Sequence, residues 1–543
     1  MARTGQWSRH RVCATARSRV RTGFALVVAL WLALAGPAAT AKTLRWATRG
    51  DVLTMDPYTT DESVSANVAN LIHDALVERD PSMALVPRLA TSWTRIDDRT
   101  WRFALRRGVR FHDGTPLTAD DVVFSIGRAQ DLRSAYAQYA RALGHAIRID
   151  DSTVELKQDK PNPLLLEHLN AIFIMSRAWA VAHHAERPLD LKAKDENYVA
   201  QHANGTGPYR LVSREPGVRT VLARNPDWWG HAEGNVTDVV YTPIASDATR
   251  VAALLSGAID LVQDPPPQDL ARFRGDDALR VYDGPENRII FLGMDQHRDA
   301  LEGSDVIGRN PFKDRRVRVA VWKAIDVQAL STKIMRGQSL PTGCMATSPA
   351  GCPDPALERV APADPAGARQ LLAEAGYANG FGLTLDCPND RYINDRDLCV
   401  AIAGMLARVG IRVRVDAMPK AIYFPKLSRT ETAFYLHGWG GSITDAQDVL
   451  DAILHSTDDA TAKGSINYGR YVDPPLDRLI DAAGVEMDPV RRKRLLVDAM
   501  AMQAEAHHYI VLHRQKLTWV ARRNVVPVLL PSNIVRVEWI RMD

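Results

Sequence analysis

The sequence predicts an α/β protein that is built from more than one domain. Residues 381–387 and 411–415 have strand patterns, and apolar residues at helical spacing lie between them. Such a strand–helix–strand unit implies parallel strands. Hairpin patterns in the first half of the chain add antiparallel strands. The chain has 543 residues, 46% of them hydrophobic, and single cores stop growing near about 250–300 residues, so two or three domains are expected.

Residues 1–41 have the features of a secretory signal peptide. Six arginines and no acidic residue precede residue 22, an apolar run follows at 24–35, and small residues end at Ala41. The apolar run is too short to span a bilayer comfortably, and no cysteine directly follows Ala41 for a lipid anchor. We expect cleavage after Ala41 and a soluble protein in the periplasm of a Gram-negative bacterium. An uncleaved membrane anchor is the alternative.

The net charge of +4 comes from the leader. Without its six arginines, 62 basic side chains face 64 acidic ones, so the mature chain is nearly neutral. A near-neutral chain gives no electrostatic reason to bind nucleic acid or an anionic membrane surface. We therefore expect no nucleic-acid partner.

Local patterns predict the elements of the first half. A strand at 44–47 precedes a helix over 64–76. Apolar and polar side chains alternate over 101–106, and a polar turn at 97–99 separates this strand pattern from a short run at 93–96, so a hairpin is expected. Thr118 is expected to cap a helix whose first turn carries two aspartates. Further elements are a strand pair around 147–156, a hairpin around 205–223, a short helix at 250–255 and a strand at 259–262.

The second half continues with the strand–helix–strand unit already described. Gly410 is a plausible stop for its helix. A strand at 433–436 leads into His437-Gly438-Trp439-Gly440, and a helix at 491–506 precedes a strand at 509–512.

Four segments resemble one known family. They are the block at 89–126, Gly-Thr-Gly-Pro-Tyr at 205–209, Asn-Pro-Asp-Trp-Trp-Gly at 225–230 and Leu-Leu-Ser-Gly-Ala-Ile-Asp-Leu-Val at 254–262. They resemble the family 5 solute-binding proteins of bacterial ABC importers, which include dipeptide- and oligopeptide-binding proteins. A helix-forming segment at 314–326 also resembles that family, and the likeness runs from about residue 44 to 525.

This resemblance implies two α/β lobes that enclose a solute, the periplasmic-binding-protein fold. The first lobe would be 42–286 plus 517–543, with an extra subdomain at about 77–200, and the second 287–516. Chain crossings are expected near 285–288 and 515–518. The resemblance also implies a monomer that is not an enzyme, needs no cofactor and passes a peptide or peptide-like solute to inner-membrane permease subunits.

Arg391 and Trp439 are the first candidates for ligand contact. Arg391 lies between a strand and a helix of the predicted parallel unit, and ligands of such sheets bind at the carboxyl ends of strands. A guanidinium there can hold a carboxylate or a phosphate in bidentate fashion, and the resemblance implies the carboxylate. Trp439 lies between glycines, so its indole can pack on a ligand. The alternatives are a structural arginine and a core tryptophan.

One position departs from the peptide binders. They carry an aspartate three residues after the equivalent tryptophan, which pairs with the peptide's α-amino group, and here that position is Ser442. Asp445 and Asp448 are nearby substitutes in a different register. A peptide with an ordinary free amine is therefore in doubt, and modified peptides, opine-like conjugates and sugar derivatives stay open.

Met55 and Tyr58 follow the first strand, and the resemblance places their loop at the cleft. Tyr58 could provide an aromatic wall or a hydroxyl group. The alternative is a structural turn at Asp56-Pro57, because such dipeptides form turns.

Four cysteines remain after the leader. An even number in an oxidising compartment favours disulfides, and local pairing of Cys344 with Cys352 and of Cys387 with Cys399 is our choice among three connectivities. Free buried thiols are the alternative. The pairs lack the close spacing of structural zinc sites.

Other functional classes have less support. The sequence contains no His-Glu-x-x-His, Gly-x-Ser-x-Gly or Walker-type loop, so a secreted hydrolase is a minor alternative. Some family members carry nickel complexes or haem. His437 lies beside Trp439, so binding of a metal or metallophore complex is a second minor alternative, although no cluster of metal ligands is recognised. A receptor that presents its ligand to a sensor is a third.

Overall fold

A computed structural model describes most of the chain after the predicted leader. The described residues are 41–189, 197–347, 352–440, 443–458, 460–461 and 463–543. The predicted leader, apart from Ala41, lies outside them. Within these ranges, no helix is both long enough and apolar enough to cross a bilayer. Residues 43–543 form one structural unit.

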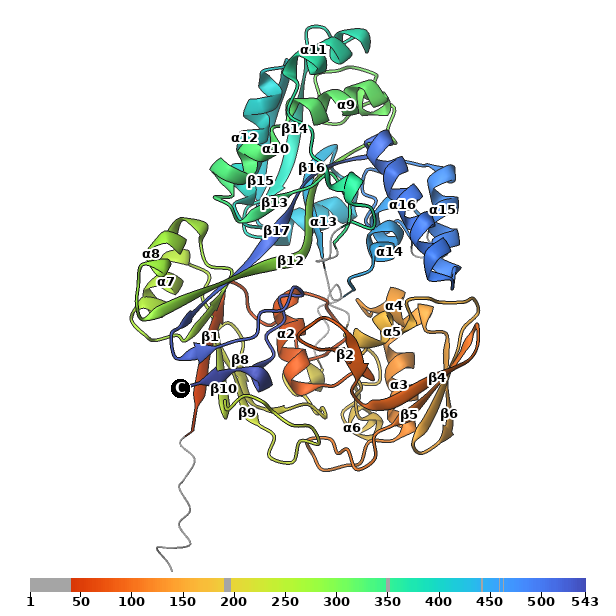
Figure 1. Ribbon diagram of the computed structural model, residues 1–543, viewed down its shortest axis with the longest axis vertical. Helices are drawn as coiled ribbons and strands as arrows, with labels where there is room; N and C mark the ends of the chain where they lie inside the picture. The colour runs from red at the N-terminus through yellow and green to blue at the C-terminus, as the bar shows by residue number, and fades with distance from the viewer. Residues whose placement is uncertain (1–40, 190–196, 348–351, 441–442, 459, 462) are drawn as a thin grey trace, which may run out of the picture. The chain divides into compact units, whose positions relative to one another are not determined.

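One large sheet runs through this unit (Figure 1), with strands in the order β15-β14-β16-β12-β17-β11-β1-β10-β9-β8 and β13 beside β17. β14 and β15 pair in parallel along their whole length, as the strand–helix–strand pattern predicts. The bounds are β1 Thr43–Thr48, β8 Tyr209–Glu215, β9 Arg219–Arg224, β10 Asp238–Pro243, β11 Leu261–Gln263, β12 Leu279–Met294, β13 Ser339–Pro341, β14 Phe381–Pro388, β15 Ile411–Met418, β16 Phe434–Gly440 and β17 Tyr509–Arg522.

β12 and β17 are long antiparallel strands that connect the two halves of this sheet (Figure 1). Their pairing is interrupted by a bulge between Pro285 and Ile289, which leaves Glu286, Asn287 and Arg288 without a partner on β17, although Arg288 still pairs with Gly440 on β16. The segments where we expected chain crossings therefore lie inside two strands. The strand expected at 509–512 is longer because its polar continuation is buried as well.

The structure has two lobes, and we propose the boundaries 42–286 plus 517–543 and 287–516 for them. The hydrophobic clusters support this division. Two clusters draw their buried residues from 289–512, and two draw theirs from 44–279 and 517–542. A fifth cluster, from 58–199, forms the core of the proposed subdomain at about 77–200.

The subdomain contains a four-stranded antiparallel sheet in the order β4-β5-β7-β6. β4 (Ala90–Asp97) and β5 (Thr100–Leu105) form the predicted hairpin. Thr118 caps α3, and Asp121 accepts its N–H at 2.9 Å, which completes a capping box. The remaining elements here are β2 Val77–Arg79, β3 Leu85–Pro87, β6 His145–Asp150, β7 Thr153–Lys157, α3 Ala119–Ala129, α4 Ala137–Ala142, α5 Leu165–Asn170 and α6 Arg177–Ala182.

Helices pack against the large sheet and extend the second lobe (Figure 1). α12, which follows β14, contacts both β14 and β15. The bounds are α2 Ser63–Ile72, α7 Asp247–Leu255, α8 Leu270–Arg274, α9 Arg315–Ala324, α10 Val327–Ala329, α11 Pro365–Glu374, α12 Asp395–Ala407, α13 Lys420–Ser428, α14 Ala446–Val449, α15 Pro474–Val485 and α16 Pro489–Ala506.

α2 ends four residues before the predicted end at residue 76. The carbonyl of Ile72 accepts the N–H of Gly207 at 2.8 Å. Directly after the helix, Asp74 forms a buried ion pair with Arg88 at 2.6 Å. A Cβ atom on Gly205 would lie 2.0 Å from the Ile72 carbonyl oxygen. The glycines of the Gly-Thr-Gly-Pro-Tyr segment therefore allow a close backbone approach to α2.

Candidate ligand cleft

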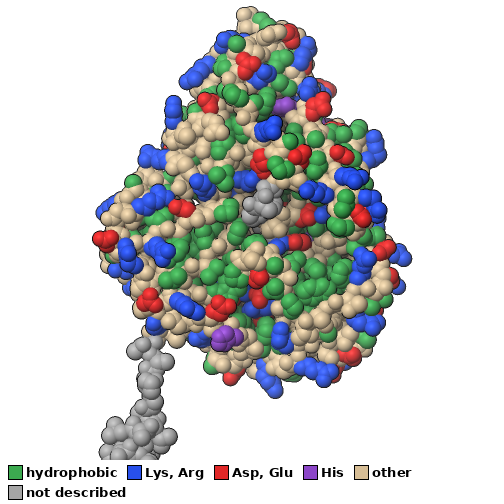
Figure 2. Space-filling view, viewed as in Figure 1, with side chains coloured by type: hydrophobic (Ala, Val, Ile, Leu, Met, Phe, Trp, Pro, Cys, Tyr) green, Lys and Arg blue, Asp and Glu red, His purple; other side chains and the backbone are tan. Residues whose placement is uncertain are grey.

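A cavity of about 460 Å³ lies between segments of both lobes, within the size range of small-molecule sites. On the face drawn in Figure 2, acidic and basic side chains are interspersed. The cavity wall carries charges of both signs. Its charged residues are Arg49, Glu62, Asp247, Asp264, Glu286, Arg288, Asp390, Arg391, Asp395, Arg396, Asp397 and Lys420.

Arg391 lines this cavity from the loop between β14 and α12. The carboxylate of Asp395 accepts the N–H groups of Arg391 and Tyr392 at 2.9 and 3.0 Å, which fixes the loop. A disulfide between Cys387 on β14 and Cys399 on α12 closes the same loop. The guanidinium lies over the Tyr392 ring, 5.3 Å from its centroid, and forms no ion pair within 4.0 Å with any described residue.

Three polar residues of the crossing strands line the cavity beside this loop. Arg288 donates from Nε to Glu286 at 2.8 Å, and Gln515 donates from Nε2 to the second oxygen of Glu286 at 2.7 Å. The Gln515 oxygen accepts the N–H of Ile393 at 3.2 Å. The β12 bulge is thus hydrogen-bonded, through β17, to the segment that carries Arg391.

Asp264 lines the cavity directly after β11. The side chain is exposed to the cavity, but the protein atoms that surround the cleft reduce its hydration and raise the pKa of its carboxyl group to about 6. The neighbouring Glu286 carboxylate raises this pKa as well, whereas Arg288 and Arg391 oppose the shift. No motif in the sequence singles out Asp264, although an aspartate before three prolines in an apolar segment is a usable signal.

Trp439 lies on β16, half-buried against the core of the second lobe. Its Nε1 donates to Asp448 at 2.7 Å, and Tyr139 of the subdomain donates to the other oxygen of that carboxylate at 3.2 Å. Arg79 and Thr444 make a second contact between the lobes, at 2.9 Å. Trp439 is not among the residues that line the cavity; its indole helps to hold Asp448 at an interlobe contact.

Asp445 is engaged by a partner in its own lobe. Both of its oxygens accept hydrogen bonds from Arg492, at 2.7 and 2.8 Å, and the carboxylate also caps α14. The Asp445 carboxylate is therefore not available to bind the ammonium group of a ligand. Ser442, the predicted departure from the peptide binders, lies outside the described residues.

Tyr58 and Met55 belong to hydrophobic cores rather than to the cavity wall. Tyr58 has no exposed surface, and its hydroxyl donates to the carbonyl of Phe173. Met55 is 3% exposed and packs in the core of the first lobe. Tyr58 therefore provides no aromatic wall to the cavity, because its ring fills the subdomain core. The turn at Asp56-Pro57 has the structural role that was the alternative.

His437 is buried on β16 among aromatic rings of Phe291, Phe424 and Tyr468. Burial lowers the pKa of its imidazole to about 3, and the positive charges of Arg391 and Arg288 add to the shift. The ring is therefore neutral at physiological pH. No other His, Cys, Asp or Glu of the described residues groups with it as a metal-binding set.

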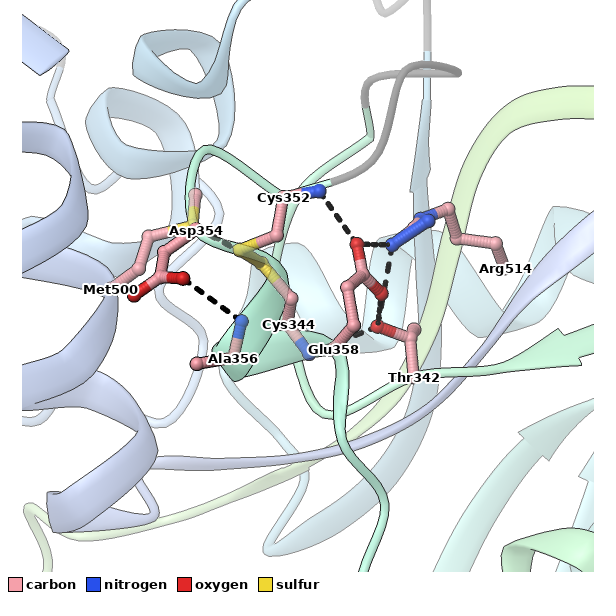
Figure 3. The surroundings of a disulfide bond; sticks show 8 residues. All are labelled: Thr342, Cys344, Cys352, Asp354, Ala356, Glu358, Met500 and Arg514. Atoms are coloured by element: carbon pink, nitrogen blue, oxygen red, sulfur yellow. Dashed lines mark hydrogen bonds and ion pairs between the residues drawn. A yellow bond between two sulfur atoms is a disulfide. The ribbon is translucent and has the colours of Figure 1, made fainter.

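The second disulfide joins Cys344 to Cys352 (Figure 3). With Glu358, these sulfurs form a group of possible metal ligands within the described residues. Bonded sulfurs are not thiolates, and thiolates are what bind metals. Glu358 is also engaged, because it accepts the N–H of Cys352 at 2.6 Å and pairs with Arg514. This group therefore has the features of a structural brace.

Comparisons with known proteins agree on one family. The model of the bacterial extracellular solute-binding proteins, family 5 (Middle), matches residues 84–461. A glutathione-binding protein, GsiB of Salmonella choleraesuis, is 25% identical over 512 residues, covering 91% of this chain and 95% of that protein.

Solved structures show the same fold. The binding protein DppA of Helicobacter pylori, in complex with the peptide STSA, has a TM-score of 0.79 at 22% identity, covering 92% of this chain and 98% of that one. AgaA of A. tumefacien R10, in complex with agropinic acid, has a TM-score of 0.77 at 21% identity, covering 92% and 99%. The chain belongs to the bacterial extracellular solute-binding proteins of family 5, the solute-binding components of ABC importers.

Proposed function

We propose that this protein captures a peptide or peptide-like solute in the periplasm and delivers it to the inner-membrane subunits of an ABC importer. The observation that carries the proposal is Arg391, whose guanidinium faces a solute-sized cavity without an ion pair among the described residues. A guanidinium of this kind recognises a carboxylate. Glutathione, peptides and agropinic acid, the ligands named for similar proteins, all carry carboxylates.

The mechanism is capture by two lobes. A ligand that contacts both lobes binds the closed form more tightly than the open form. This difference in binding free energy stabilises the closed form. The contacts from Tyr139 to Asp448 and from Arg79 to Thr444 join the lobes directly. The closed protein then docks as a monomer on the permease. No bond of the solute is made or broken, and the predicted leader directs the chain to the periplasm.

Ligand-induced stabilisation tests this function. The melting temperature of the purified protein is measured with di- to pentapeptides, opines, oligosaccharides and nickel–histidine complexes. A ligand at 100 times its dissociation constant adds about 2.7 kcal/mol of stability, and we expect peptides to do so. Mass spectrometry should recover the peptide intact. Shifts with sugars or nickel complexes alone would contradict the peptide ligand.

Two variants test the anchor. Arg391→Ala should weaken binding about 30-fold or more, which corresponds to about 2 kcal/mol. Arg408→Ala removes an exposed arginine just beyond the other end of α12 and should leave affinity unchanged. Equal affinities of wild-type and Arg391→Ala protein would refute the role of Arg391.

A further inference from the structure

Arg391 in the second lobe and Asp264 in the first are opposite charges on the cavity wall, and neither has an ion-pair partner among the described residues. Four neighbours of Arg391 on the wall also form no ion pair with described residues: Asp390, Asp395, Arg396 and Asp397. In the first lobe, Asp264 is the one charge on the described cavity wall without an ion pair. Other charges on this wall neutralise each other, through the ion pairs Arg49–Asp247 at 3.0 Å, Arg288–Glu286 at 2.8 Å and Lys420–Glu62 at 3.9 Å.

The backbone holds Asp264 rigidly. Its N–H donates to the carbonyl of Thr518 on β17 at 3.2 Å, and three prolines, 265–267, follow it. Its φ is +50°, a left-handed conformation that L-residues other than asparagine and aspartate rarely adopt. Gln263 and Pro265 on either side are buried, whereas Asp264 itself is exposed. Residues in this conformation persist where the surrounding structure requires them, often at functional sites.

Among the described residues, the Asp264 carboxylate accepts one side-chain hydrogen bond, from Asn533. Asn533 is its neighbour, and the Asn533 oxygen accepts from Trp519 Nε1 at 2.8 Å and from Gln263 Nε2 at 2.9 Å. This fixes the amide so that its Nδ2 faces Asp264, at a long 3.5 Å. An ionised carboxylate has about four acceptor positions, so Asp264 can accept further donors from the cavity.

We propose that Asp264 binds the ammonium group of the solute while Arg391 binds its carboxylate, so that the ligand is a zwitterion held between the lobes. This inference rests on the proposed function. It supplies the acidic partner that Ser442 cannot provide. Asp445 and Asp448, the substitutes near Ser442, are occupied by Arg492 and by Trp439 with Tyr139.

Calorimetric titration with blocked probes tests the assignment. The probes are Ala-Leu, Ala-Ala-Leu and glutathione, each with a free and with an acetylated amine. Asp264→Asn should weaken a free-amine probe about 30-fold or more and leave its acetylated form within about threefold of wild type. Asparagine tolerates positive φ, so the backbone is preserved. Asp269→Asn, in the same segment but off the cavity wall, should change neither form.

The two proposals fail in distinguishable ways. If a free-amine probe binds wild-type and Asp264→Asn proteins equally, the role of Asp264 is refuted and the peptide function stands. If no probe binds the wild-type protein, the peptide function fails, and the zwitterion assignment fails with it.

Discussion

The ion pair between Asp56 and Arg128 has no exposed side-chain surface on either partner. Arg128 donates from Nη1 and Nη2 to the two Asp56 oxygens, at 2.8 and 2.6 Å. Its Nε donates to the carbonyl of Ala185 at 2.9 Å. The pair attaches the loop after β1 to α3, and this loop continues to Glu62 on the cavity wall.

Asp56→Asn keeps the shape of the side chain but leaves the guanidinium buried without a counter-charge. Removing one partner of a buried pair costs about 3–5 kcal/mol. Burial opposes ionisation of Asp56, but Arg128 and the Tyr58 N–H outweigh it and hold the pKa below its usual value. A lowered pKa stabilises the fold above the unfolded-state pKa, and that contribution is lost as the pH falls through the folded-state pKa. The difference between variant and wild type should therefore be full at pH 7 and shrink in acid.

Calorimetric melting at pH 7 measures the effect. At about 2–4 °C per kcal/mol for units of 150–250 residues, Asp56→Asn should lower the melting temperature of the first lobe by about 10 °C. Asp299→Asn is the control, because its ion pair with Lys313 is exposed and such pairs contribute about 1 kcal/mol or less. A loss for Asp56→Asn no larger than the control's would refute the reasoning.

Three further predictions concern the cleft. Replacing Cys387 and Cys399 by alanine removes the disulfide that closes a loop with a sequence separation of 12 residues. Denaturant titration should show that the free energy of unfolding falls by about 3 kcal/mol. Solute affinity should also fall, because the loop that carries Arg391 is no longer held by this disulfide. Burial raises the pKa of Asp448 to about 7. The stability that this carboxyl group contributes is therefore full below its unfolded-state pKa and is lost as the pH rises through the folded-state pKa. Melting temperatures of Asp448→Asn should lack this fall in stability between about pH 4 and 7, and a fall as large as that of the wild type would contradict the prediction. The Asp264 carboxyl group has a pKa of about 6 and is surrounded by Glu286, Arg288, Arg391 and Asn533. Its protonation should weaken zwitterion binding about tenfold between pH 7.5 and pH 5. The affinity of Asp264→Asn should not show this change with pH.

Much of the fold could be predicted because it depends on local periodicity. The alternation in β4 and β5 and the helical spacing in α12 both reflect one buried face, which is visible in a short window. β17 was predicted too short because polar residues such as Arg514 and Gln515 interrupt its apolar pattern. They are buried against Glu358 and Glu286, which are distant in sequence.

Part of the candidate site could be predicted from the sequence and part could not. The position of Arg391 follows from a topological rule about strand ends, so the sequence could indicate it as a candidate. The wall formed by Asp264, Glu286 and Asn533 could not be predicted, because these side chains meet only when β11, β12 and the C-terminal segment come together. Tyr58 was assigned to the cleft by its loop, and its burial depends on the packing of the subdomain.

The sequence by itself determined the order of the elements, the family resemblance and the absence of an acidic side chain at Ser442. Only the tertiary structure decided which charges are available to a solute. Asp445 is occupied by Arg492, 47 residues away, and Glu286 by Gln515, 229 residues away. Charge interactions depend on distance in space and on burial, and neither quantity has a period that can be recognised along the chain.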